Sequence, residues 1–237
     1  MDKFKINGPS KIRGEVSISG SKNAALPILA ATLLFDKNVT IKNLPRVKDI
    51  DTMLNLLKSL GRKISFKNNK KIATISKGKK NNFFAPYSLV KTMRAGILVL
   101  GPLLAKNKKA KVSSPGGCSI GVRPIDIHLK AISKLGVKIQ IEKGYVNAKA
   151  QEGLVGSEIR FSKISVGATE NLILAACLAK GTTTIKNCAI EPEIKDLTNF
   201  LKTAGAKIKW IGKRTLQIEG VKTCLLYTSP SPRDAES

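Results

Sequence analysis

The sequence has few of the residues on which many binding proteins depend. Among its 237 residues are one histidine and one tryptophan, and aromatic residues make up only 5%. So few aromatic side chains, without a zinc-finger or RNP-type motif, disfavour a dedicated nucleic-acid-binding protein. Four cysteines occur without paired spacing, which predicts free thiols in a reducing compartment rather than disulfides or a metal site. They are Cys118, Cys177, Cys188 and Cys224.

Long hydrophobic runs are also absent. The most apolar stretch, residues 24–31, is too short and too interrupted to span a bilayer. The first five residues contain no apolar run typical of a signal peptide. We therefore expect a cytoplasmic protein that does not bind a membrane. Hydrophobic residues make up 42% of the chain, enough for one or two globular domains with a substantial core.

Negative charge is scarce, with 16 acidic against 42 basic residues and a net charge of +26. Such a charge favours contact with a phosphate backbone, so a non-catalytic basic module that binds nucleic acid stays an alternative function. However, 34 of the basic residues are lysines scattered along the whole chain, which is typical of a composition bias. A cleft for a phosphorylated small substrate would account for part of the charge. We therefore expect no nucleic-acid partner.

A unit of helix, strand, helix and two strands occurs three times. The first helix of each unit is apolar nearly all round and should be buried; these helices cover residues 28–34, 97–105 and 173–179. The second helix is amphipathic and ends at Gly61, Gly136 or Gly205, which suit the left-handed conformation beyond a helix end. Each of these helices begins near an aspartate, Asp51, Asp126 or Asp196, which can cap the N-terminus or favour it. Three such units predict an α/β fold with buried helices inside and sheets outside.

Cys118 lies in a loop rich in glycine and proline, residues 113–124. Glycines on both sides allow the backbone to approach a ligand closely, and Arg123 can hold an anion or favour the reactive thiolate. A lone cysteine is more often an inert, small apolar residue. The loop alone leaves both interpretations open.

A second cluster, residues 20–25, opens the first buried helix. There the ammonium of Lys22 and the helix N-terminus can face one anion. Together with the cysteine loop and the repeat, this cluster resembles the UDP-N-acetylglucosamine enolpyruvyl transferase family. The resemblance runs from Met1 to about Val221, and its strongest motifs are residues 21–27, 89–95, 115–118, 121–126 and 165–169.

The resemblance implies a threefold-repeated, inside-out α/β barrel and a specific reaction. Members transfer the enolpyruvyl group of phosphoenolpyruvate to the 3-hydroxyl of UDP-N-acetylglucosamine and release phosphate. This is the first committed step of peptidoglycan synthesis, on which cell-wall biogenesis, cell shape and cell division depend. Neither a metal nor an organic cofactor is implied. A 3-phosphoshikimate 1-carboxyvinyltransferase shares the repeat and is the alternative enzyme, but the Pro-Gly-Gly-Cys loop and residues 123–126 favour the nucleotide-sugar enzyme.

The resemblance also implies roles for individual residues. Cys118 is expected to protonate the methylene carbon of phosphoenolpyruvate and to be the thiol that fosfomycin alkylates. Lys22, Asn23 and Arg123 are expected to bind phosphoenolpyruvate. The residues expected to hold UDP-N-acetylglucosamine are Arg94, Arg123, Pro124, Ile125, Asp126, Ile127, Lys163, Ile164, Ser165 and Val166. We expect His128 to be exposed or to act only through other residues, rather than as a catalytic base.

Family members have two domains of three units each, with the active site between them, whereas this chain contains three units. We expect residues 21–222 to form the first domain and residues 1–20 to be a strand segment that packs with the second domain. Residues 223–237, with the run Ser-Pro-Ser-Pro, are expected to be a disordered tail outside the family pattern, and whether they are an artefact stays open. We expect the chain alone to bind substrates weakly and not to turn over.

Overall fold

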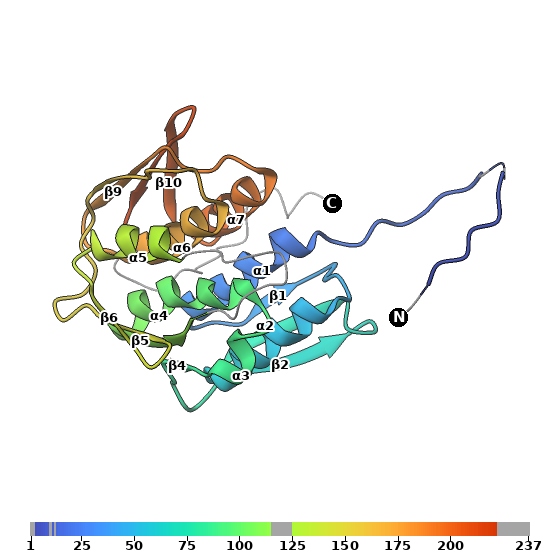
Figure 1. Ribbon diagram of the computed structural model, residues 1–237, viewed down its shortest axis with the longest axis horizontal. Helices are drawn as coiled ribbons and strands as arrows, with labels where there is room; N and C mark the ends of the chain where they lie inside the picture. Colours follow the sequence, from blue (N-terminus) through green and yellow to red (C-terminus); the bar gives the residue numbers. More distant parts are fainter. Residues whose placement is uncertain (1–2, 10, 12, 115–124, 222–237) are drawn as a thin grey trace, which may run out of the picture.

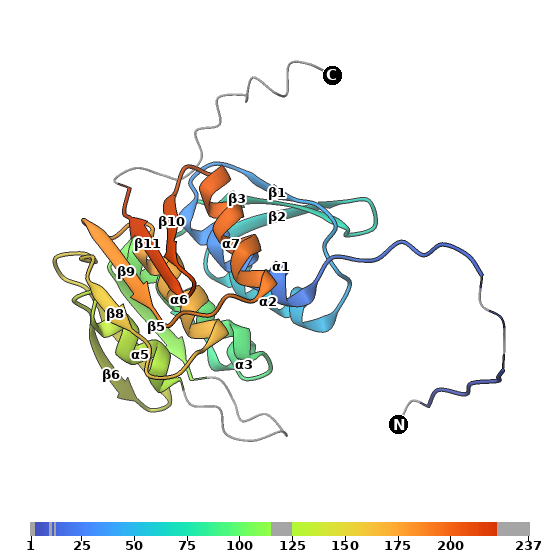
Figure 2. The ribbon, with the colours of Figure 1, turned by 90° about the horizontal axis from the view of Figure 1, so that it is seen from above.

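The computed structural model describes residues 3–9, 11, 13–114 and 125–221. Three sheets surround a group of helices, as Figures 1 and 2 show. The first sheet has the order β1-β3-β2, the second β4-β5-β7-β6 and the third β10-β11-β9-β8. The pairs β4–β5 and β8–β9 are parallel, and the other pairs are antiparallel. The strands are β1 (Val39–Ile41), β2 (Arg62–Lys67), β3 (Ile72–Lys77), β4 (Phe84–Ala85), β5 (Lys109–Ser113), β6 (Lys138–Glu142), β7 (Tyr145–Lys149), β8 (Glu158–Arg160), β9 (Thr182–Lys186), β10 (Lys207–Gly212) and β11 (Thr215–Glu219).

The helices form two sets, as the repeat predicts. The inner helices are α1 (Lys22–Ala31), α4 (Leu100–Asn107) and α6 (Val166–Ala176), and the outer ones are α2 (Lys48–Ser59), α5 (Asp126–Ser133) and α7 (Pro192–Thr203). Short turns complete the set: η1 (Thr32–Leu34), α3 (Tyr87–Val90) and η2 (Arg94–Val99). Helix α4 packs on α6, α1 contacts α2 and α7, and α5 packs on α6. The predicted fold, with buried helices inside and sheets outside, is confirmed.

The ends of the outer helices confirm one sequence prediction and contradict another. Gly61, Gly136 and Gly205 have φ angles of 94°, 84° and 96°, a region that glycine adopts without the steric penalty of a Cβ. Of the two roles predicted for the aspartates, capping is wrong: the residues at the N-cap positions, Val47, Ile125 and Glu191, make no side-chain capping bond. Asp51 and Asp126 lie instead within the first turn, where the helix dipole favours negative charge, and in α7 Glu193 rather than Asp196 has this position.

The first helix of the second unit is interrupted. The sequence predicts one helix over residues 97–105, but the structure has the 3₁₀ turn η2 followed by α4, which begins at Leu100. Pro102 accounts for this start, because proline has no N–H group and is tolerated only in the first turn of an α-helix.

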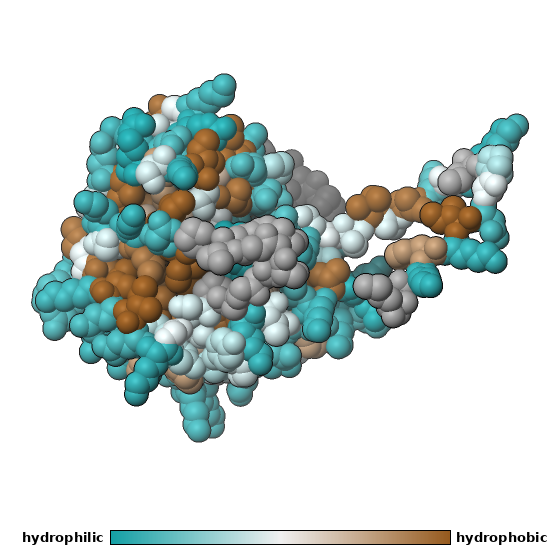
Figure 3. Space-filling model, in the orientation of Figure 1, coloured by the Kyte–Doolittle hydropathy of each residue, from teal (hydrophilic) through white to brown (hydrophobic). Residues whose placement is uncertain are grey.

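The N-terminal segment leads away from the body of the molecule (Figures 1 and 3). Its described residues, 3–9, 11 and 13–20, form no strand. Four large apolar side chains on it, Phe4, Ile6, Val16 and Ile18, are between 79% and 99% exposed. Within the described ranges, no helix is long and apolar enough to cross a membrane.

The contact between α4 and α6 depends on a glycine. The N–H group of Gly101 donates to the Oδ1 atom of Asn171 over 2.7 Å. A Cβ atom at residue 101 would lie 2.6 Å from that Oδ1 and closer still to the backbone carbonyl oxygen of Asn171. The two inner helices can therefore approach this closely only without a side chain at this position.

Gly101→Ala should destabilise the fold by about 3 kcal/mol, because the added methyl group forces α4 away from α6. Helix propensity alone would make the alanine variant more stable by about 1 kcal/mol. The sign of the change in the free energy of unfolding therefore tests the packing contact. The measurement is urea unfolding followed by circular dichroism. Gly212→Ala is the control, because a Cβ there makes only ordinary contact with Thr215. Equal stability of Gly101→Ala and the parent chain would contradict the prediction.

Candidate active site

A pocket of about 560 Å³ opens where the N-terminal ends of α1, α2, α6 and α7 come together with η2 and α5. Both α1 and α6 begin with a serine at the N-cap position: the Oγ atoms of Ser21 and Ser165 accept from the N–H groups of Ala24 and Ala168, over 3.4 and 3.3 Å. The N-terminal ends of these helices carry partial positive charge. Anionic ligands are thereby favoured in this pocket.

Six of the residues that the sequence predicts for the site line this pocket. They are Lys22, Asn23, Arg94, Ile164, Ser165 and Val166. They come from the start of α1, the start of η2 and the segment that leads into α6. The sequence motifs from all three units are therefore brought to one place.

The other predicted residues are not among those that line the pocket. Ile125 and Asp126 begin α5, where Asp126 lies 3.8 Å from Lys130. Ile127 lines a separate groove of about 190 Å³ between α5 and β8. Lys163 is exposed one residue before Ile164. Cys118, Arg123 and Pro124 lie outside the described residues.

Lys22 is held at the mouth of the pocket by an ion pair. Its Nζ atom lies 3.0 Å from Oδ2 of Asp49, in the first turn of α2. Both side chains are partly exposed, so the pair contributes little to the stability of the fold. Its main consequence is to fix the position of the ammonium at the pocket.

His128 is buried, with an exposed fraction of 2%, and it lines the pocket. Of the two expectations for this residue, exposure is therefore wrong. The Nδ2 atom of Asn171 donates to the carbonyl oxygen of Ile97 over 3.0 Å and lies 3.3 Å from Nδ1 of His128. Since an amide nitrogen only donates, Nδ1 is the acceptor and the proton of the neutral ring is on Nε2. Burial lowers the pKa of His128 to about 4; the Arg94 guanidinium also lowers it, and Asp126 opposes the change.

Glu170 is a second buried titratable group in the pocket. It lies in α6 and is 5% exposed. Burial raises the pKa of its carboxyl group to about 8, and the neighbouring Glu193 carboxylate adds to the rise. At neutral pH the acid is therefore mostly protonated. Elsewhere, burial raises the pKa of the Cys177 thiol to about 12, which makes that cysteine inert.

Sequence reasoning did not predict the remaining titratable residues that line the pocket, which are Asp49, His128, Glu170 and Glu193. A signal existed for two of them. Asp49 precedes Gly61 by the same number of residues as Glu193 precedes Gly205, so the repeat places both in the first turn of an outer helix. Nothing in the sequence distinguished Glu170 from an exposed acid. Across the described part of the chain, no three His, Cys, Asp or Glu side chains cluster in a way that could hold a metal ion.

Comparison with known proteins identifies the class of this fold and site. The family model described as EPSP synthase (3-phosphoshikimate 1-carboxyvinyltransferase) matches residues 6–230, and the chain belongs to this family. Among solved structures, the enolpyruvyl transferase NikO from Streptomyces tendae aligns with a TM-score of 0.77 and 21% identity, over 92% of this chain and 51% of that one. An EPSP synthase from Acinetobacter baumannii aligns with a TM-score of 0.71 and 18% identity, over 90% and 48%. At such identities these likenesses show the fold.

Curated relatives narrow the resemblance within the family. The UDP-N-acetylglucosamine 1-carboxyvinyltransferase of Pelagibacter ubique (strain HTCC1062) is 66% identical over 221 residues, which cover 93% of this chain and 52% of the relative. The protein of the same name from Psychrobacter sp. (strain PRwf-1) is 53% identical over 223 residues, 93% of this chain and 51% of the relative. The predicted resemblance is confirmed. The chain spans about half the length of these curated relatives.

Glu170→Gln should remove a pH dependence of folding stability. The folded-state pKa of about 8 lies above the ordinary value of 4.5, so the stability that the protonated acid provides is complete below pH 4.5 and is lost as the pH rises through 8. Glutamine mimics the neutral acid at every pH. Between pH 5 and 8.5, the parent chain should therefore lose about 2–4 kcal/mol relative to the variant.

Urea unfolding of both proteins across this pH range measures the difference. His128 contributes equally to both proteins and cancels. Glu152→Gln, at an exposed position, is the control and should follow the parent curve. Parallel curves for the parent and Glu170→Gln would show that the Glu170 carboxyl group is not held in its neutral form.

Proposed function

We propose that this chain is part of an enzyme that transfers the enolpyruvyl group of phosphoenolpyruvate to the 3-hydroxyl of UDP-N-acetylglucosamine and releases phosphate. The observation that carries the proposal is the 66% identity to a UDP-N-acetylglucosamine 1-carboxyvinyltransferase. The pocket supports it, because Lys22, Asn23 and Arg94 lie together there at helix ends suited to anions. The reaction would be the first committed step of peptidoglycan synthesis, in the cytoplasm, and would serve cell shape and cell division.

In this proposal, the two ends of the pocket bind different substrates. Lys22 and Asn23, at the start of α1, bind the phosphate and carboxylate of phosphoenolpyruvate together with Arg123. Ser165 and Val166, at the start of α6, offer backbone N–H groups to the diphosphate of the nucleotide sugar, which Arg94 and Lys163 also contact. Residues 123–127 hold the rest of the nucleotide sugar, and Cys118 protonates the methylene carbon of phosphoenolpyruvate. Neither a metal nor a cofactor takes part.

The active site is completed by residues outside this chain. Since the chain spans about half the length of its curated relatives, we propose that residues 21–222 are one of two domains and that the catalytic cleft lies between them. The exposed apolar side chains of residues 3–9 and 13–20 then pack on the second domain, where they are removed from water. The chain alone would bind UDP-N-acetylglucosamine but not turn over.

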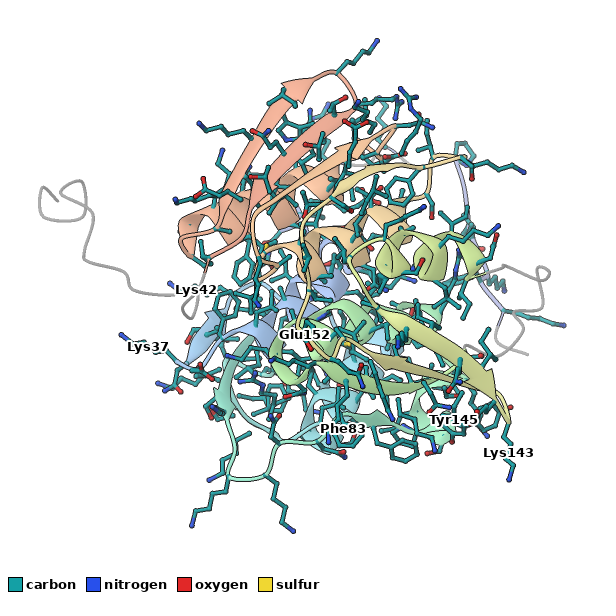
Figure 4. The ribbon with its side chains drawn as sticks, turned by 90° about the vertical axis from the view of Figure 1, so that its left-hand side faces the viewer. Lys37, Lys42, Phe83, Lys143, Tyr145 and Glu152 are labelled. Carbon is teal, nitrogen blue, oxygen red and sulfur yellow. The ribbon has the colours of Figure 1, made fainter. Side chains whose placement is uncertain are left out.

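Two alternatives have less support. A 3-phosphoshikimate 1-carboxyvinyltransferase shares the family model, but the relatives of 53% and 66% identity carry the name of the nucleotide-sugar enzyme. Only the net positive charge of the chain favours a nucleic-acid-binding module. In Figure 4, Lys37 and Lys42 extend from one side of the molecule and Lys143 extends from the opposite side.

Calorimetric titration of the chain with UDP-N-acetylglucosamine should detect binding that UDP-glucose does not reproduce. Arg94→Ala should weaken this binding about tenfold or more, because a charge-assisted hydrogen bond to the ligand is lost. Lys149→Ala, on the exposed end of β7, is the matched control and should bind as the parent does. Binding that disappears in moderate salt and does not distinguish the two nucleotide sugars would favour a general polyanion surface instead.

Fosfomycin should alkylate Cys118 alone, and UDP-N-acetylglucosamine should accelerate the reaction. Cys177 and Cys188 provide internal controls because both are fully buried. Mass spectrometry of the intact chain and of its peptides, with and without the nucleotide sugar, measures the adduct. Equal labelling of several cysteines, or no adduct on Cys118, would contradict the proposed role of this residue.

A further inference from the structure

Glu170 lies at the pocket without a partner. It belongs to the second turn of α6, is 95% removed from solvent and lines the pocket. No hydrogen bond or ion pair joins its side chain to any residue that the structure describes. Its oxygens are not fully closed off, since the described side-chain atom that is both fully buried and without a partner is Oγ1 of Thr183, so the Glu170 carboxyl group still reaches the pocket. A polar group that binds to it, whether water or a ligand, therefore enters from the pocket.

The neighbouring charges do not compensate an ionised Glu170. Each element around the pocket contributes one titratable or charged group: Lys22 from α1, Asp49 from α2, Arg94 from η2, His128 from α5 and Glu193 from α7. The Lys22 ammonium is paired with Asp49, and His128 is neutral. The Glu193 carboxylate repels a second negative charge, and so would an anionic ligand. These surroundings favour the protonated form of Glu170, whose O–H group is a hydrogen-bond donor.

A purely structural role does not account for a glutamate at this position. The buried residues that surround it on α6 include Ala168, Leu172 and Ile173, and an apolar side chain of similar volume would avoid the cost of burying a carboxyl group. Residues that reduce stability in this way are found where function requires them. The side of Glu170 that is open is the side facing the pocket.

On the basis of the proposed function, we propose that Glu170 is a substrate-binding residue that acts as a neutral acid. Its carboxyl O–H group donates a hydrogen bond to an oxygen of UDP-N-acetylglucosamine, while Glu193 keeps the negative charge of the pair. Once ionised, Glu170 can only accept hydrogen bonds, and it repels the diphosphate. Binding above the pKa of the free acid therefore requires uptake of one proton.

Calorimetric titration of the 237-residue chain with UDP-N-acetylglucosamine between pH 6 and 9, in two buffers of different ionisation enthalpy, tests this inference. With a free-state pKa of about 8, the affinity of the parent chain should fall about tenfold between pH 6 and 9, with uptake of up to one proton. The nucleotide sugar is the suitable probe, because its diphosphate does not titrate in this range. Glu170→Gln keeps a donor and should bind at all pH values about as tightly as the parent does at pH 6.

Two further variants separate the effect of the hydrogen-bond donor of Glu170 from the effect of the neighbouring negative charge. Glu170→Val removes the donor and should bind about tenfold more weakly than Glu170→Gln at every pH. Glu193→Gln removes the neighbouring carboxylate and should move the midpoint of the affinity decrease to lower pH. The urea midpoint of each variant shows whether it is folded at the pH of the titration.

The outcomes distinguish a failure of the inference on Glu170 from a failure of the proposed function. If Glu170→Gln retains the proton uptake and the affinity decrease of the parent, or if Glu170→Val binds as tightly as the parent at pH 6, the inference on Glu170 is overturned while the proposed function stands. If neither the parent nor Glu170→Gln binds the nucleotide sugar at any pH, the proposed function itself is contradicted, and this inference with it.

Discussion

The amide group of Asn171 joins the second and third units at the centre of the fold. Its Oδ1 atom accepts from Gly101 over 2.7 Å, and its Nδ2 atom donates to Ile97 over 3.0 Å and lies 3.3 Å from Nδ1 of His128. A buried amide with all of these groups satisfied specifies one relative position of α6, η2, α4 and α5. The same contact orients the imidazole that forms part of the pocket wall. The hydrogen bonds of Asn171 therefore both hold the inner helices together and orient part of the pocket wall.

The threefold repeat explains why the site lies where it does. The first residues of α1, η2 and α6 are Lys22, Arg94 and Val166, one from each unit, and all three line the pocket. The repeated backbone brings the starts of α1, η2 and α6 together, and each unit contributes different side chains to the pocket. The repeat thus determines where the pocket lies, and the side chains that differ between the units determine its chemistry.

The architecture could be predicted from the sequence because it depends on local patterns. Apolar helices, amphipathic helices and closing glycines such as Gly61 recur with the repeat, and the structure follows them. The capping prediction was wrong because aspartates near a helix start serve equally well within its first turn. The burial of His128 and Glu170 could not be predicted, since it is decided by which helices pack around them. Cys118 and Arg123 were assigned by resemblance alone and lie outside the described residues.

The charge of the whole chain and the charge of the pocket have different origins. Although the chain carries a net charge of +26, the basic and acidic side chains that line the pocket in the described part of the structure are two cations, Lys22 and Arg94, together with Asp49, Glu170, Glu193 and the neutral His128. Lysines on the surface are screened at physiological ionic strength and do not determine what the pocket binds. An anion is favoured inside only if the helix N-termini act on it and at least one acid is neutral. Of the three acids, Glu170 is the most buried, and burial together with the Glu193 carboxylate favours its neutral form.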